Sequence, residues 1–185
     1  DYGALEIVNL LASSVALIAG MNLGEGLFRY YHETEESGGG RKTVASALVL
    51  AVVLNALGAV LLTALAPALA GQFLSGSESW YFVSIAAVTL ISEACISIVT
   101  CHMRAEGDAW KFFWSGIARL GLHIAFNLFF LVYLQLGLLG IFLGSLASSV
   151  LIAATILPYT IRRAGLTVSK VSVKLLLGFG GPLIL

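Results

Sequence analysis

Five long apolar segments, separated by short polar breaks, determine what this chain can fold into. They cover residues 5–28, 43–73, 80–103, 110–134 and 138–161, and a sixth begins near residue 174 and runs to residue 185. A helix needs about 20 mainly apolar residues to cross the hydrocarbon core of a membrane. The sequence therefore predicts an all-α, polytopic bundle of transmembrane helices that forms a single lobe over residues 1–185. The second segment is longer than a span requires, so it either tilts or ends at Pro67.

Composition supports a membrane protein and excludes several other classes. Only 11% of the residues are charged, against roughly 25% in soluble domains, and a formal net charge of zero argues against a nucleic-acid partner. The six residues of helix between Cys95 and Cys101 span about 9 Å, which is beyond the reach of a disulfide. The string from His32 to Glu36 lacks the second histidine of a zinc helix, and there is no phosphate-binding loop. We expect neither a metal nor a cofactor, and no enzymatic activity.

Basic residues are confined to alternate loops. Nine of the ten lie in three of them: Arg29, Arg41, Lys42, Arg104, Lys111, Arg162, Arg163, Lys170 and Lys174. The connections at 74–79 and 135–137 contain none. The positive-inside rule places the three basic loops in the cytoplasm, which predicts a multi-pass protein of the cytoplasmic (inner) membrane. The first segment then starts outside, so we expect a fragment, with at least one helix upstream and more downstream.

Polar residues inside the fourth segment form a stripe. Arg119, His123 and Asn127 are spaced by four residues and so share one face of a helix. Glu93 lies 13 residues before Glu106, the centre of the preceding turn, and Arg119 lies 13 residues after it. Two antiparallel helices would bring this carboxylate and guanidinium to the same depth. Intramembrane charge usually marks a substrate or proton pathway, and the alternative is a purely structural ion pair.

The first segment adds Asn22 and Glu25 as candidate residues of a cavity wall. Asn22 lies about one turn deeper than Glu25. A surface pair between Glu25 and Arg29, four residues apart, is the simpler explanation for Glu25.

Two pairs of glycines have the spacing of close helix contacts. Gly20 and Gly24 lie on the first segment, and Gly140 and Gly144 lie on the fifth. Static packing is the simpler interpretation, and a moving interface is the alternative.

Several motifs, in order along the whole chain, resemble one family of transporters. They are Asp1-Tyr2-Gly3 followed by Glu6, Gly24-x-Gly26-Leu27-Phe28-Arg29-Tyr30-Tyr31-His32-Glu33, Arg104-Ala105-Glu106-Gly107 with Lys111-Phe112, Arg119 with Asn127, and KLLLGFGGPLI from Lys174. In this order they are similar to the O-antigen-type polysaccharide biosynthesis flippases of the multidrug/oligosaccharidyl-lipid/polysaccharide exporter superfamily. The match runs from about the second helix of that family to the start of its seventh.

The resemblance implies the N-terminal lobe of a two-lobe exporter fold with a central cavity. It implies translocation of a lipid-linked oligosaccharide, typically on undecaprenyl pyrophosphate, by alternating access. Arg119 would then meet phosphate or an acidic sugar, His123 and Asn127 would meet sugar hydroxyls, and Glu93 would balance Arg119 in the empty cavity. The implied partners are this substrate, membrane lipids, the missing second lobe and polysaccharide polymerase or assembly proteins.

Two other functions stay open. A cation-coupled multidrug exporter of the same superfamily would use Glu93 as its coupling carboxylate, although the basic stripe around Arg119 argues against it. A scaffold subunit of a polysaccharide-synthesis complex would not transport at all. A membrane glycosyltransferase is weaker still, because the loops are short and lack an acidic sugar-nucleotide motif.

The predicted orientation can be tested with membrane-impermeant thiol labels. We expect a cysteine at Ser37 to react only from the cytoplasm and one at Ser77 only from outside, because the first lies in a basic loop and the second does not. The reverse labelling pattern would overturn the topology.

Overall fold

The computed structural model describes residues 2–20, 23–35, 39–73, 80–165 and 167–180, and this part of the chain contains helices and no strand. The helices are α1 (Tyr2–Gly20), α2 (Leu23–Glu35), α3 (Gly40–Phe73), α4 (Trp80–Ala105), α5 (Ala109–Leu128), the π-helix η1 (Phe129–Tyr133), α6 (Leu138–Ala164) and α7 (Lys170–Gly180). Five stretches are long and apolar enough to cross a membrane: Asn9–Glu33, Gly40–Pro67, Tyr81–Ala105, Ala109–Tyr133 and Leu138–Ala164. The predicted all-α, polytopic class is confirmed.

The helix boundaries differ from the sequence prediction in places that have local physical causes. The first segment is described as two helices, and α2 continues to Glu35 rather than ending near residue 28. Its polar last turns are supported by Arg29, whose Nε lies 4.0 Å from Glu33 one turn later. Helix α3 passes through Pro67 and continues to Phe73, so the alternative of an ending at the proline is wrong.

Helix α7 begins four residues earlier than predicted because a serine caps it. The backbone N–H of Ser172 donates to Ser169 Oγ at 3.5 Å, the geometry of an N-cap. The same cap is joined to α3, since the N–H of Ser169 donates to Ser46 Oγ at 2.9 Å. Thr43 and Ser172 hydroxyls lie 3.2 Å apart beside it. A short polar cluster therefore fixes the start of α7 against the start of α3.

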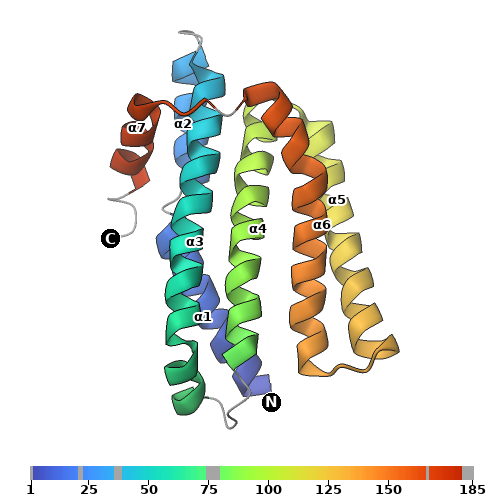
Figure 1. Cartoon of the computed structure of the whole chain (residues 1–185). Coiled ribbons are helices and arrows are strands. Elements are labelled where there is room, and N and C mark those ends of the chain that lie inside the picture. Colours follow the sequence, from blue (N-terminus) through green and yellow to red (C-terminus); the bar gives the residue numbers. More distant parts are fainter. Residues whose placement is uncertain (1, 21–22, 36–38, 74–79, 166, 181–185) are drawn as a thin grey trace.

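Helix α4 is the centre of the bundle and contacts α1, α2, α3, α5 and α6. Figure 1 shows α3, α4, α6 and α5 side by side in one row, with α1 behind α3 and α4 and with α7 beside the upper part of α3. The α3–α4 contact is the most extensive in the bundle, and both helices bury alanines, among them Ala47, Ala51, Ala59 and Ala87. Small residues let two backbones approach closely, which is the main source of packing energy in a membrane where lipid is as apolar as leucine.

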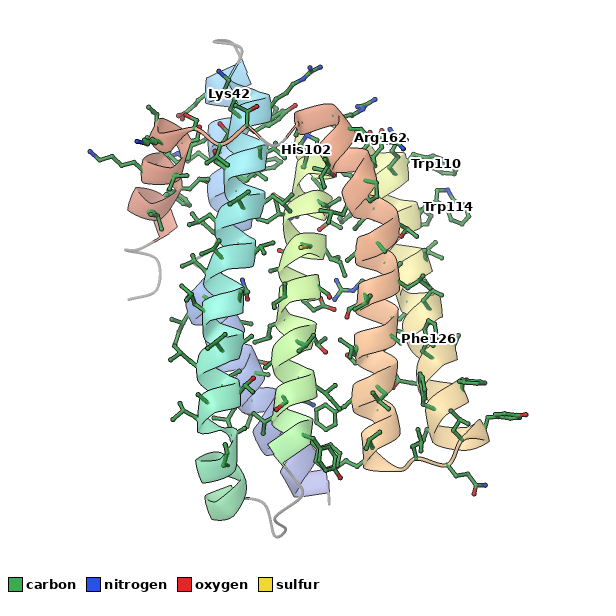
Figure 2. The ribbon with its side chains drawn as sticks, viewed as in Figure 1. Lys42, His102, Trp110, Trp114, Phe126 and Arg162 are labelled. Atoms are coloured by element: carbon green, nitrogen blue, oxygen red, sulfur yellow. The ribbon has the colours of Figure 1, made fainter. Side chains whose placement is uncertain are left out.

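Loops with basic residues gather at one end of the bundle. The α4–α5 turn and the α6–α7 connection lie at the same end as the start of α3 (Figure 1). Figure 2 shows Lys42 and Arg162 at that end, with Trp110 and Trp114 on the outer side of α5. We call this the basic end. Ser37 and Ser77 lie outside the described residues, but the helix ends nearest to them are at opposite ends of the bundle.

The two glycine pairs behave differently. A Cβ at Gly144 would lie 2.8 Å from Asn127 Oδ1 and 3.1 Å from Asn127 Cα, and one at Gly140 would lie 3.0 Å from the carbonyl oxygen of Phe130. The expected close contact at Gly140 and Gly144 is therefore present. It joins α6 to η1 and to the half of α5 that lies away from the basic end. At Gly20 a Cβ would meet nothing within 4 Å among the described atoms. The other pair makes no joint contact, because Gly20 ends α1 and Gly24 belongs to α2.

We predict that Gly144→Ala lowers the free energy of unfolding by about 1–3 kcal/mol, the usual cost of an extra methylene in a tightly packed contact. Unfolding by SDS in mixed micelles measures this change. Gly121→Ala is the matched control on α5, because its Cβ would meet nothing within 4 Å and alanine favours helix by about 1 kcal/mol. Equal stability of the two variants would contradict the close contact.

Candidate functional site at a charged pair between two cavities

Glu93 and Arg119 form an ion pair between α4 and α5. Arg119 Nη2 donates to Glu93 Oε2 at 2.5 Å, and the two side chains are 48% and 36% exposed, respectively. The turn at 106–108 is short, so antiparallel helices bring residues equally far from it to one depth. The pairing predicted from the sequence is confirmed. A charge-assisted bond of this kind is stronger than a neutral hydrogen bond, and it ties two helices that otherwise touch little.

A first cavity of about 540 Å³ lies on one side of this pair. Its wall comes from α1, α2, α3 and α4 and is completed by Arg119 of α5. Asn55, only 3% exposed, lines it from α3, although its amide donates to Ala51 O at 2.9 Å within its own helix. The cavity thus has a polar wall in the middle of the bundle.

Most of its polar wall is a stripe on α4 that the sequence reasoning missed. Glu93, Ser97, Thr100 and Arg104 all line the cavity, and their spacings of four, three and four residues put them on one helix face. The spacing is present in the sequence, but Arg104 is expected in the loop and serine and threonine are common in membrane helices, so the stripe does not stand out.

A second cavity of about 330 Å³ lies on the other side of the pair, between α4, α5 and α6. Glu93 and Arg119 line both cavities. The rest of the second wall is rich in hydroxyls from α6 and includes the imidazole of α5: Ser145, Ser148, Ser149 and His123. His123 Nδ1 lies 3.3 Å from Ser148 Oγ. The charged pair therefore separates two polar chambers.

The other predicted site residues lie in different places. Asn127 lines neither cavity; its amide donates to His123 O at 2.9 Å, and its buried Oδ1 finds no hydrogen-bond donor within the described part of the chain. The reason is the approach of Gly144, which turns Asn127 into a helix-contact residue. Glu25 lines the first cavity, and Arg29 pairs with Glu33 instead of Glu25. Asn22 lies outside the described residues.

Ion pairs at the basic end fasten the α4–α5 turn to the end of α6. Arg163 Nη1 lies 3.2 Å from both carboxylate oxygens of Glu106, and the buried His102 Nε2 lies 3.6 Å from the same carboxylate. Lys111 binds Asp108 and also donates to the Tyr159 hydroxyl at 3.0 Å. Helices α4, α5 and α6 are therefore held together at this end.

Asp108 also caps α5, because its Oδ1 accepts from the backbone N–H of Lys111 at 3.3 Å. The hydrogen bond from the Lys111 side chain lowers the pKa of Asp108 below its usual 3.8. A lowered carboxyl pKa contributes stability above the unfolded-state pKa, and that contribution is lost as the pH falls through the folded-state value. The cap is therefore in place at neutral pH.

Among the described residues, no three histidine, cysteine or acidic side chains gather as they would to hold a metal ion. The chemistry that this site offers is recognition: two guanidiniums, two carboxylates and several hydroxyls around polar cavities in a membrane bundle. A family model described as "polysaccharide biosynthesis protein" matches residues 1–185. The chain belongs to the polysaccharide biosynthesis protein family. No curated protein and no solved structure matches it.

Membership in this family indicates the cellular process to which the membrane bundle belongs. A polysaccharide biosynthesis protein with five helices of transmembrane length is a multi-pass membrane protein of polysaccharide biosynthesis or export. Two charged side chains within its apolar helices, Glu93 and Arg119, form an ion pair where two cavities adjoin.

We predict an energetic coupling of about 0.5–3 kcal/mol between Glu93 and Arg119, as is usual for residues in direct contact. Glu93→Gln, Arg119→Gln and the double variant form the cycle, with the free energy of unfolding in detergent as the readout. Each single variant leaves one charge without its counterion. The double variant is therefore expected to lose less free energy of unfolding than the sum of the losses in the two single variants. Strict additivity would mean that the pair is not formed in the detergent-solubilised protein.

Proposed function

We propose that this chain is the transport lobe of a flippase, which moves a lipid-linked oligosaccharide from the cytoplasmic to the outer leaflet. The observation that carries the proposal is the Glu93–Arg119 pair, which lies between two polar cavities inside an apolar bundle. Charged groups are costly within a membrane unless they face protein or water, and those that persist usually belong to a substrate or ion pathway.

The chemistry of Arg119 suits the pyrophosphate of a polyprenyl carrier. A guanidinium keeps its charge at every physiological pH and offers a planar fork of donors that matches phosphate oxygens. In the empty state, Glu93 takes the place of the anion and satisfies Arg119. Substrate binding then exchanges one carboxylate for one phosphate, so the guanidinium is never left unpaired in a medium of low dielectric constant.

The hydroxyl-rich chamber behind the pair suits the sugar head group. Ser145, Ser148 and Ser149 offer donors and acceptors from α6, and His123 adds a ring nitrogen from α5. Sugars carry many hydroxyls and need such paired donors and acceptors to replace water. In this proposal the charged pair holds the phosphate while the serines of α6 meet the sugar.

Transport by alternating access needs a second lobe, against which this one rocks around a site near the midplane. The partners in this proposal are that lobe, the lipid-linked oligosaccharide, membrane lipids and polysaccharide polymerase or assembly proteins. The protein would act in the cytoplasmic membrane and would not be an enzyme. The sharing of Glu93 with Arg119 weighs against a cation-coupled drug exporter, in which that carboxylate would have to be available to the coupling ion.

We predict that Arg119→Ala abolishes surface polysaccharide while the protein still inserts in the membrane at wild-type level. The loss follows because, within the described part of the chain, Arg119 is the one guanidinium beside the second cavity. Arg162→Ala is the control, as it removes one cation from the basic end and from neither cavity wall. Polymer is measured on gels of extracted polysaccharide and insertion by immunoblot of membranes.

Normal polymer output from the Arg119 variant would remove this residue from the transport site. A variant that inserts and loses polymer, yet still flips a labelled lipid-linked oligosaccharide in proteoliposomes, would favour the non-transporting scaffold instead.

A further inference from the structure

The two arginines of the first cavity differ in whether they already have a partner. Arg119 is paired with Glu93, but no carboxylate of the described residues pairs with Arg104. The guanidinium of Arg104 instead lies over the ring of Phe112, 5.5 Å from its centroid. The guanidinium also hydrogen-bonds the side chain of Cys101, one turn earlier on α4. Stacking uses the face of a guanidinium, so its remaining N–H donors are left for an anion.

The positions of the two arginines place them at different depths. Arg104 is in the last turn of α4, two residues before Glu106 of the basic end. It follows Glu93 by 11 residues, which corresponds to about 16 Å along a helix at 1.5 Å per residue. Ser97 and Thr100 lie between them on the same face and line the same cavity. A polar track therefore connects the basic end of the cavity with the charged pair.

We propose that Arg104 is the first station for the anionic head group, which it captures at the cytoplasmic end of the cavity before the phosphate moves to Arg119. This inference rests on the proposed flippase function and adds a residue and an order of events to it. The ligand chemistry is a polyprenyl-linked pyrophosphate.

The order of binding follows from the interaction that each arginine loses when an anion binds to it. An anion that binds Arg104 displaces no other charge, whereas an anion that binds Arg119 must displace Glu93 from a 2.5 Å contact. Capture at Arg104 is therefore the easier first step. Once the phosphate has advanced, it competes with Glu93 at short range, and the released carboxylate faces two polar cavities in which it can be hydrated.

A simpler role for Arg104 would be a topogenic charge of the positive-inside type. Arg162 separates the two roles, since it lies at the same end of the bundle and lines neither cavity (Figure 2). If charge at that end were all that mattered, neutralising either arginine would have the same effect.

The test is equilibrium binding of fluorescent undecaprenyl pyrophosphate to the protein in neutral-lipid nanodiscs. Arg104→Ala is expected to raise the Kd about ten-fold, the usual effect of losing one charge-assisted bond. Arg104→Lys is expected to be intermediate, and Arg162→Ala is expected to match the wild type. Glu93→Gln frees Arg119, so in that background the effect of Arg104→Ala is expected to shrink to three-fold or less.

Competitors identify which phosphate Arg104 binds. Displacement of the probe by inorganic pyrophosphate, weakened in Arg104→Ala, supports the inference. Displacement by phosphatidylglycerol as effective as that by undecaprenyl pyrophosphate would assign Arg104 to surrounding lipid and overturn it. A Kd within two-fold of wild type in Arg104→Ala, together with lost binding in Arg119→Ala, would also overturn it while leaving the flippase proposal intact. If the wild-type protein neither binds nor flips the probe, the proposed function itself fails.

Discussion

The cost of placing charge in a medium of low dielectric constant is the constraint on which this structure depends. A guanidinium and a carboxylate in the middle of an apolar bundle are tolerated only when they are paired or in contact with a polar cavity. The Glu93–Arg119 contact meets both conditions, because the two groups satisfy one another and both line two polar chambers. This pairing joins α5 to α4, two helices that make few other contacts.

Different interactions join the helices at the two ends of the lobe. At the basic end, Glu106, Arg163, Lys111 and Tyr159 join the α4–α5 turn to α6. At the opposite end, Gly140 and Gly144 bring α6 against η1 and α5 at backbone distance. Between these two attachments lies the stretch of α5 that carries Arg119 and His123. Helix α5 is therefore attached to its neighbours at both ends. Between these attachments Arg119 reaches Glu93 beside the two cavities, which give a ligand room to enter without dismantling the bundle.

Much of this arrangement could be predicted from the sequence, because it depends on long-range averages. Segment hydropathy predicted the spans, loop charge predicted which connections share an end, and equal spacing from Glu106 predicted that Glu93 would meet Arg119. Other features depend on local or tertiary detail. The extension of α7 rests on one serine cap at Ser169, and the contact of Asn127 with Gly144 depends on how closely α6 approaches α5. Neither the cavities nor the partnering of each arginine follows from spacing alone, since both require the positions of all neighbouring helices.

One consequence follows from the fact that α5 has no buried residue along its whole length. Its outward side chains, such as Ile117 and Ile124, contribute solubility in lipid rather than cohesion of the lobe. Apolar residues of different shape can therefore replace one another there over evolutionary time with little penalty. Selection acts instead on a narrow line of positions along the inner side of the same helix, so within this family α5 is expected to drift on one side and to stay constant on the other.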